Sequence, residues 1–235
     1  DGTNIYIYDV TDQRLDGIKA VTAAHEMLHA AYARLSDADK QRIDSLLESE
    51  YDKLKDNRNF TERMAFYART EPGERSNELH SVIGTEVSDI GSELEQYYSR
   101  YFKDRQVVVQ LHDGYSKVFT DLQDRANQLV KQLDTLSAAI KSDSAKYNTM
   151  VADLNKAISD FNARTQNNEF SSQSEFAQER AVLLQRADQL DQMRNDINAS
   201  IARYDALQTQ LESVSSQSDA LNRSIDSSLA PAPTV

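Results

Sequence analysis

The sequence predicts a mainly α-helical protein, with a compact N-terminal part of α+β type followed by a long antiparallel two-helix coiled coil. The distribution of three residue types supports this division. All six glycines lie at or before Gly114 and all four histidines at or before His112, whereas residues 115–230 contain neither glycine nor proline. Long stretches without glycine or proline are typical of long helices, because these residues cost most inside a helix. We therefore place a boundary between Phe102 and Gly114.

The composition excludes several classes of protein. The chain has 235 residues, of which 38 are acidic and 26 basic, and its net charge is −12. An acidic surface repels phosphate backbones, so we expect no nucleic acid partner. The absence of cysteine removes disulfides, thiol catalysis and sulfur-ligated zinc, which leaves His, Asp and Glu as candidate metal ligands. No run of eighteen apolar residues is present, so we expect no membrane span within this chain.

The N-terminal part begins with a predicted strand. Residues 4–10 alternate isoleucine with tyrosine, which is the two-residue period of a strand with two different faces. A helix is expected next, and it ends near Ser36. Ser36 and Asp39 resemble a capping box that opens another helix, after which three or four shorter helices reach Phe102.

The C-terminal part carries a heptad seam. From Leu122 to Phe161, most apolar residues follow one another at alternating spacings of four and three. A polar stretch over 164–172 interrupts the seam, and a second apolar series runs from Leu183 to Ile225. Two matched helices joined by a short polar loop predict an antiparallel hairpin. The alternative is one continuous helix that dimerises in parallel.

The hairpin register can also be predicted. Pairing Phe161 with Phe176 across the loop places Asp143, the charged residue of the first seam, opposite Arg194 in the second. We expect this pair to specify the register, because slipping the hairpin would leave each charge against apolar neighbours.

The first predicted helix contains the motif HExxH, formed by His25, Glu26 and His29. Residues four apart on a helix share one face, so both imidazoles can reach the same metal ion. Glu26 would stand beside the open coordination position, where it can accept a proton from a metal-bound water. The alternative is a metal-free pair of histidines whose rings form hydrogen bonds with neighbouring carboxylates.

No third histidine follows His29 at the spacing of the metzincins, so we expect the third ligand to be a carboxylate. Candidates stand in a predicted helical stretch over 76–86. Here the sequence resembles the gluzincin clan of zinc metallopeptidases, in which a glutamate on a later helix completes the HExxH site. The pair Asn77 and Glu78 is similar to the thermolysin-type pattern, although Val82 stands where that pattern has an acidic residue. The separation of Glu78 from His29 is closer to that of lethal-factor-like members.

This resemblance implies a zinc site formed by His25, His29 and Glu78, with Glu26 as the catalytic base. Glu86, two turns further along the same face, is the alternative ligand or a residue that orients one of the histidines. The resemblance also implies that Tyr67 stabilises the oxyanion, whereas packing is the simpler role for one of many tyrosines. It implies as well that the strand at 4–10 pairs with an extended substrate. The alternative is a strand that only packs against the helix. We expect His80 to lie behind the ligands or at the surface, and His112 carries no signal.

Three regions follow from these predictions. Residues 1–104 would form a zincin-like metallopeptidase domain with an edge strand, residues 105–230 the coiled-coil hairpin, and residues 231–235 a frayed tail or linker. The expected function is zinc-dependent hydrolysis of a peptide or protein substrate, with the hairpin positioning the enzyme or recruiting a protein partner. The alternative is a cell-envelope interaction module whose metal site is structural or inactive. Long hairpins rich in Ser, Asn and Gln resemble those of bacterial envelope proteins, which favours an extracytoplasmic location.

Overall fold

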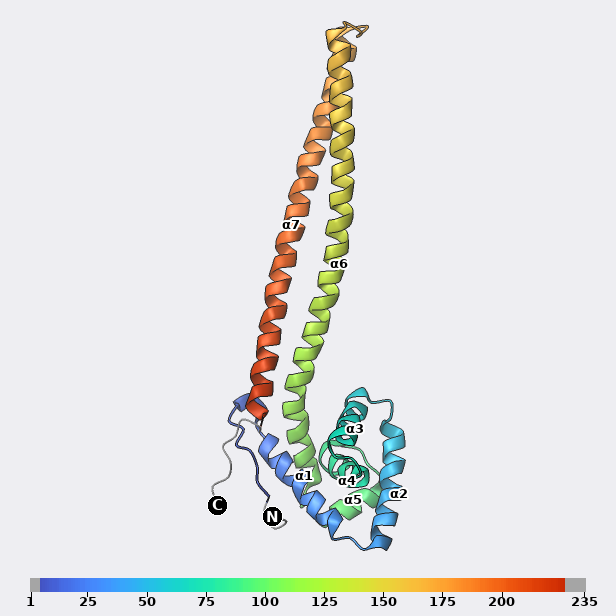
Figure 1. Cartoon of the computed structure of the whole chain (residues 1–235), viewed down its shortest axis with the longest axis vertical. Helices are drawn as coiled ribbons and strands as arrows, with labels where there is room; N and C mark the ends of the chain where they lie inside the picture. Colours follow the sequence, from blue (N-terminus) through green and yellow to red (C-terminus); the bar gives the residue numbers. More distant parts are fainter. Residues whose placement is uncertain (1–4, 227–235) are drawn as a thin grey trace. The chain divides into compact units, whose positions relative to one another are not determined.

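The computed structural model describes residues 5–226, and most of these residues are helical (Figure 1). After a short 3-10 helix over Gln13–Leu15, the described chain forms seven α-helices: α1 (Ile18–Ala33), α2 (Asp37–Leu54), α3 (Arg58–Thr70), α4 (Arg75–Glu86), α5 (Ser92–Tyr98), α6 (Arg105–Gln166) and α7 (Gln173–Ile225). The contacts divide the chain into two compact units. One comprises the residues up to Asp121 and those from Ser218 on, and the other comprises Leu122–Gln217. Within the described residues, no helix combines the length and apolar character that crossing a membrane requires.

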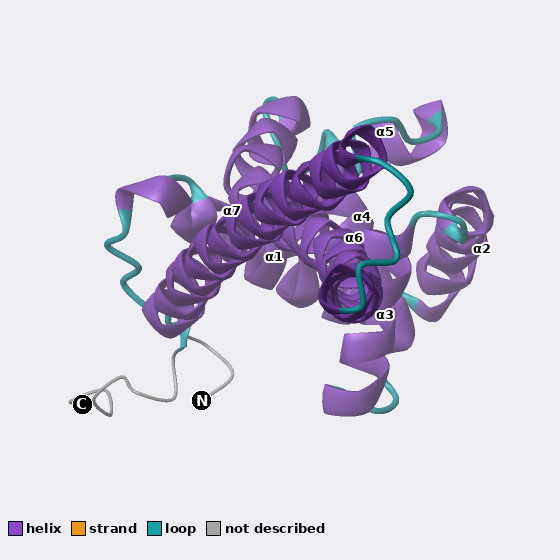
Figure 2. Cartoon of the chain, turned by 90° about the horizontal axis from the view of Figure 1, so that it is seen from above, coloured by secondary structure: helices purple, strands orange, loops and turns teal. Residues whose placement is uncertain are grey.

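The predicted edge strand, and with it the α+β description of the N-terminal part, is wrong for the residues described. Residues 5–10 belong to no regular element, and only helices and loops appear in the described chain (Figure 2). Ile5, Tyr6 and Ile7 are all exposed. A strand needs a neighbouring strand for its backbone hydrogen bonds, and alternation of side chains alone does not supply one. Asn4, the first residue of the predicted strand, lies outside the described residues, as does the predicted tail over 231–235.

The helices of the first unit begin where local chemistry allows. Gly17, with a φ of 91°, precedes α1 in a left-handed conformation that suits glycine. The predicted cap at Ser36 is confirmed, since its side chain accepts a hydrogen bond from the Asp39 amide at the start of α2. Asn57 caps α3 in the same way through the Phe60 amide.

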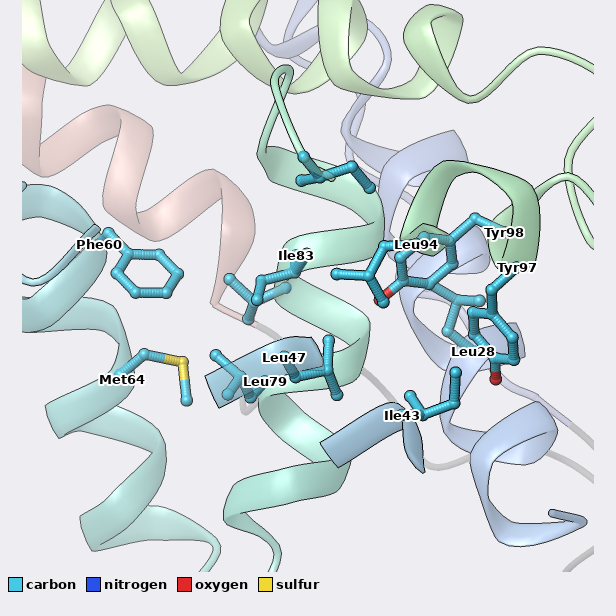
Figure 3. Packing of buried hydrophobic residues seen from close by; sticks show 12 residues of the cluster. Leu28, Ile43, Leu47, Phe60, Met64, Leu79, Ile83, Leu94, Tyr97 and Tyr98 are labelled. Carbon is cyan, nitrogen blue, oxygen red and sulfur yellow. The ribbon is translucent and has the colours of Figure 1, made fainter. Parts of the chain in front are cut away.

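The first unit is built on an apolar core to which α1 to α5 contribute (Figure 3). Leu28 of α1, Ile43 and Leu47 of α2, and Leu79 of α4 are fully buried within it. Helices α1 and α4 approach closely at Gly84, where a Cβ atom would collide with Leu28 and would lie 2.8 Å from Cε1 of Tyr98. This close approach brings the chemistry-bearing faces of α1 and α4 together.

Arg105, the first residue of α6, ties that helix to the end of α4. Its guanidinium donates hydrogen bonds to the carbonyl oxygens of Val87 and Ser88 at 2.5 and 3.0 Å and forms an ion pair with Glu95. A cation at the carboxyl end of a helix satisfies carbonyls that have no partner inside the helix and opposes the negative end of the helix dipole. The side chain of Arg105 is 3 % exposed, so this anchor is part of the buried core.

The second unit is the predicted antiparallel hairpin, in which α6 and α7 run side by side in opposite directions (Figure 1). Residues 167–172 interrupt the helix, which rules out one continuous helix. The rings of Phe161 and Phe176 pack with centroids 5.0 Å apart, as predicted, and Phe170 joins them. Arg164 closes the loop through ion pairs with glutamates at the start of α7.

The predicted charge pair in the hairpin is wrong. Asp143 and Arg194 are both exposed, and Arg194 pairs with Asp191 on its own helix at 3.0 Å. Ser144 and Met193 are the half-buried residues at these points of the two helices. An ionised side chain loses hydration when it is buried, so a neighbouring neutral residue occupies the seam at lower cost.

Candidate metal centre

Helix α1 places the two histidines of the HExxH motif side by side. His25 and His29 are one turn apart, and their ring centroids lie 4.6 Å apart with an interplanar angle of 82°. His25 is buried and His29 is half-buried, because this face of α1 packs towards α4. The helical spacing therefore brings two imidazoles to one point, as the motif predicts.

Helix α4 supplies the third group from its first turn. Oε2 of Glu78 lies 3.6 Å from Nε2 of His25, and Oε1 lies 3.5 Å from Nε2 of His29. One ligand atom from each of the three residues lies within 4.8 Å of the other two. In the part of the chain that the structure describes, His25, His29 and Glu78 are the only such group of metal-ligating side chains.

Asn77 locates one proton of the His29 ring, at Nδ1. The Asn77 side-chain amide donates from Nδ2 to Glu74 at 3.3 Å, so its Oδ1 faces Nδ1 of His29 at 3.0 Å. Because an amide oxygen only accepts, Nδ1 of His29 carries the proton, and Ser81 Oγ lies 3.2 Å from the same nitrogen. When the ring is neutral, the lone pair is therefore on the other nitrogen, Nε2, which faces the Glu78 carboxylate.

In the neutral tautomer, Nε2 of His29 and Oε1 of Glu78 are two acceptors that face each other across 3.5 Å, an arrangement that a cation between them would satisfy. A neutral Nε2 cannot donate to a carboxylate, and Oε2 of Glu78 is buried without any hydrogen-bond partner. Leaving a buried carboxylate oxygen unsatisfied is costly, whereas a metal ion between the three groups would satisfy all of them. The donor set of two imidazoles and one carboxylate is the kind that catalytic zinc sites use, with a fourth position left for water or substrate.

Glu26 and Tyr67 flank this group. Glu26 is half-buried and follows His25 directly, and among residues 5–226 its carboxylate has no hydrogen-bonding or ion-pair partner. The ring of Tyr67, from α3, stacks on the ring of His25 with centroids 5.9 Å apart and an interplanar angle of 20°. Burial, followed by the nearby charge of Glu86, raises the pKa of Tyr67 to about 12. The phenol is therefore neutral near pH 7 and keeps a proton to donate.

Glu86, the alternative third ligand, is engaged elsewhere. Its Oε1 accepts a hydrogen bond from Arg63 at 2.9 Å, and its Oε2 lies 3.4 Å from Nε2 of His112. Helix α4 is regular, so Glu78 in its first turn and Glu86 at its end are separated by two turns along the axis. The structure thus brings Glu78, and not Glu86, to the two histidines.

The other two histidines are both buried. His80 is fully buried, so the expectation of a surface position is excluded, and its Nε2 forms a hydrogen bond with the Tyr97 hydroxyl at 2.9 Å. Burial lowers the pKa of His80 to about 3, so this ring is neutral. His112, which had no signal in the sequence, meets Glu86 and Ser116. Sequence spacing gives no hint of a contact between α6 and the end of α4.

The chain was compared with known protein families, curated proteins and solved structures. No protein family, curated protein or solved structure matches the chain. The site is therefore interpreted from its own residues.

Proposed function

We propose that this protein is a zinc-dependent peptidase whose metal ligands are His25, His29 and Glu78. The observation that carries the proposal is the buried carboxylate oxygen of Glu78, which has no hydrogen-bond partner and faces two imidazoles. Nitrogen and oxygen ligands from three side chains, with a free glutamate adjoining them, are the elements of a catalytic zinc site.

Each residue has a defined role in this proposal. When bound, zinc would acidify a water molecule and polarise the carbonyl of the scissile amide. Glu26 accepts the proton that the attacking water loses and delivers it to the amine nitrogen as the C–N bond breaks. Tyr67 donates its phenolic proton in a hydrogen bond to the carbonyl oxygen as negative charge develops there. Asn77 keeps His29 in the tautomer that presents Nε2 to the metal.

The hairpin and the location complete the proposal. We assign to the hairpin the recruitment of a protein partner, supported by exposed apolar side chains on both helices, among them Val130, Ile158 and Val182. Extracytoplasmic or envelope association rests on composition alone. A structural or inactive metal site in an envelope interaction module is the competing function.

One set of variants separates the two functions. The purified chain is loaded with zinc and tested on a fluorescence-quenched peptide library as wild type, Glu26→Gln, His29→Ala and the exposed control Glu212→Gln. We expect Glu26→Gln to retain one equivalent of zinc and lose at least about a hundredfold in kcat. His29→Ala should lose the zinc, and Glu212→Gln should behave as wild type. If the wild-type protein holds a full equivalent of zinc but hydrolyses no peptide in the library, the result would support the structural site instead.

A further inference from the structure

Three helices of the first unit meet at a half-buried carboxylate beyond the proposed metal ligands. Glu86 ends α4, its side chain is 11 % exposed, and Arg63 of α3 donates to it at 2.9 Å. His112 of α6 contacts the other carboxylate oxygen at 3.4 Å. We call Arg63, Glu86 and His112 the clasp. The Arg63 side chain is 37 % exposed, so this ion pair is partly solvated, and Glu86 is the member that contacts both of the others.

The clasp is linked to the metal centre through α3. Arg63 and Tyr67 are four residues apart on that helix and therefore lie on the same face, one turn from each other. Tyr67 uses this face to stack on His25. The buried side chains of Phe60 and Met64 hold α3 in the core. The pairing of Arg63 with Glu86 adds a contact on the face that presents the Tyr67 ring to His25.

The α6 side of the clasp is also held firmly. Nε2 of His112 lies 2.9 Å from Oγ of Ser116, and the His112 ring packs edge-on against Tyr115 with centroids 5.3 Å apart. Arg105 anchors the same helix to the carbonyls that follow α4. The carboxylate of Glu86 thus lies between the guanidinium of Arg63 and the imidazole of His112, and Ser116 and Tyr115 hold that imidazole in place.

We infer that the clasp is a positioning device for Tyr67, so that Arg63, Glu86 and His112 act on the proposed reaction through that tyrosine. The catalytic meaning of this inference rests on the proposed peptidase function. The positioning of Tyr67 does not depend on that function, because the stacking of Tyr67 on His25 can be measured in the zinc-free protein.

The test uses NMR of the zinc-free chain with ¹³C-labelled histidine, which gives ring signals from only four residues. The ring current of Tyr67 displaces the His25 signals, and Tyr67→Leu defines their unstacked position. We expect Arg63→Met to move the His25 signals at least half of the way to that position and Arg63→Lys to move them less. Arg58→Met, an exposed change on the same helix, should leave them in place. If Arg63→Met does not fold, Glu86→Gln provides the same measurement.

Unchanged His25 signals in folded Arg63→Met or Glu86→Gln would overturn the inference, whether or not the protein is a peptidase. Where hydrolysis is measurable, Arg63→Met should lower kcat by about tenfold to a hundredfold with zinc affinity unchanged. The same change made in Tyr67→Phe should cause no additional loss, because the clasp acts through the Tyr67 hydroxyl. If the double variant instead loses kcat by the product of the two single losses, the clasp does not act through the Tyr67 hydroxyl.

Discussion

The unit that carries the candidate metal centre and the hairpin of α6 and α7 bury different kinds of side chain. Every buried polar or charged residue in the described chain lies between His25 and His112. In Leu122–Gln217 the buried residues are all Leu or Val: Leu129, Leu133, Leu154, Leu190, Leu207 and Val214. The hairpin is therefore held by an interchangeable apolar seam, whereas the first unit depends on particular donor and acceptor pairs. Substitution of polar residues should distinguish the two units sharply.

The largest effect is expected at Arg105. We expect Arg105→Met to lower the free energy of unfolding by about 3–5 kcal/mol, because Glu95 and the carbonyls after α4 lose their donor. Its hairpin counterpart Arg194→Met, which removes an exposed pair, should change stability by less than about 0.5 kcal/mol. Urea unfolding of both variants measures the difference, and equal losses would contradict the comparison.

Metal affinity should show the next largest effect. Glu78→Gln should weaken zinc binding by at least about a hundredfold, more than most changes to residues that only orient ligands. Glu86→Gln should alter affinity by less than about threefold, because Glu86 contacts Arg63 and His112 and not the ligands. Competition with a chromophoric chelator measures both affinities. A larger loss for Glu86→Gln would restore Glu86 as the ligand.

A smaller effect is expected at Tyr97. Removing its hydroxyl in Tyr97→Phe leaves His80 fully buried with neither ring nitrogen bonded, since Nδ1 already has no partner. The expected loss is about 1–3 kcal/mol in the free energy of unfolding. The matched hairpin change Tyr204→Phe should cost less than about 0.5 kcal/mol. Thermal or urea unfolding that ranks these two variants in the opposite order would refute the assignment of polar dependence to the first unit.

The smallest effect is expected within the hairpin at Asp143. Because this side chain is exposed, Asp143→Leu should change stability by less than about 0.5 kcal/mol. Leu154→Ala, which empties a buried position on the same helix, should cost about 2–5 kcal/mol and shows that the assay responds to the seam. A loss of more than about 1 kcal/mol for Asp143→Leu would support the Asp143–Arg194 charge pair first predicted from the sequence.

Sequence reasoning succeeded where a single helix carries the information. The spacing of His25 and His29, the cap at Ser36 and the heptads on either side of the loop are all local patterns, and the structure reproduces their geometry. It failed where the outcome depends on a partner from elsewhere in the chain. The alternating residues 5–10 have no strand to pair with, and the choice between Asp143 and Ser144 is made by burial cost.

The candidate site shows the same limit. Both Glu78 and Glu86 lie on one face of α4, and only the position of α1 along that helix decides which carboxylate meets the histidines. His112 is separated from Glu86 by more than twenty residues, and its role follows only from the packing of α6. The family resemblance includes Asn77, but its effect on the tautomer of His29 follows only from its hydrogen bond to Glu74 in the structure.

The contact at Gly84 bears on which ions the proposed metal centre would admit. Helix α1 would supply two nitrogen ligands and α4 one oxygen ligand, and the separation of these helices is set where Gly84 meets Leu28 and Tyr98. Moving them apart to accommodate a larger ion would open a cavity around Leu28, which is fully buried. Zinc needs ligands at about 2.0–2.2 Å, whereas calcium gathers six to eight oxygens at about 2.3–2.6 Å. In the proposed metal centre, selectivity by ionic size would thus depend on the apolar core as well as on the ligand atoms.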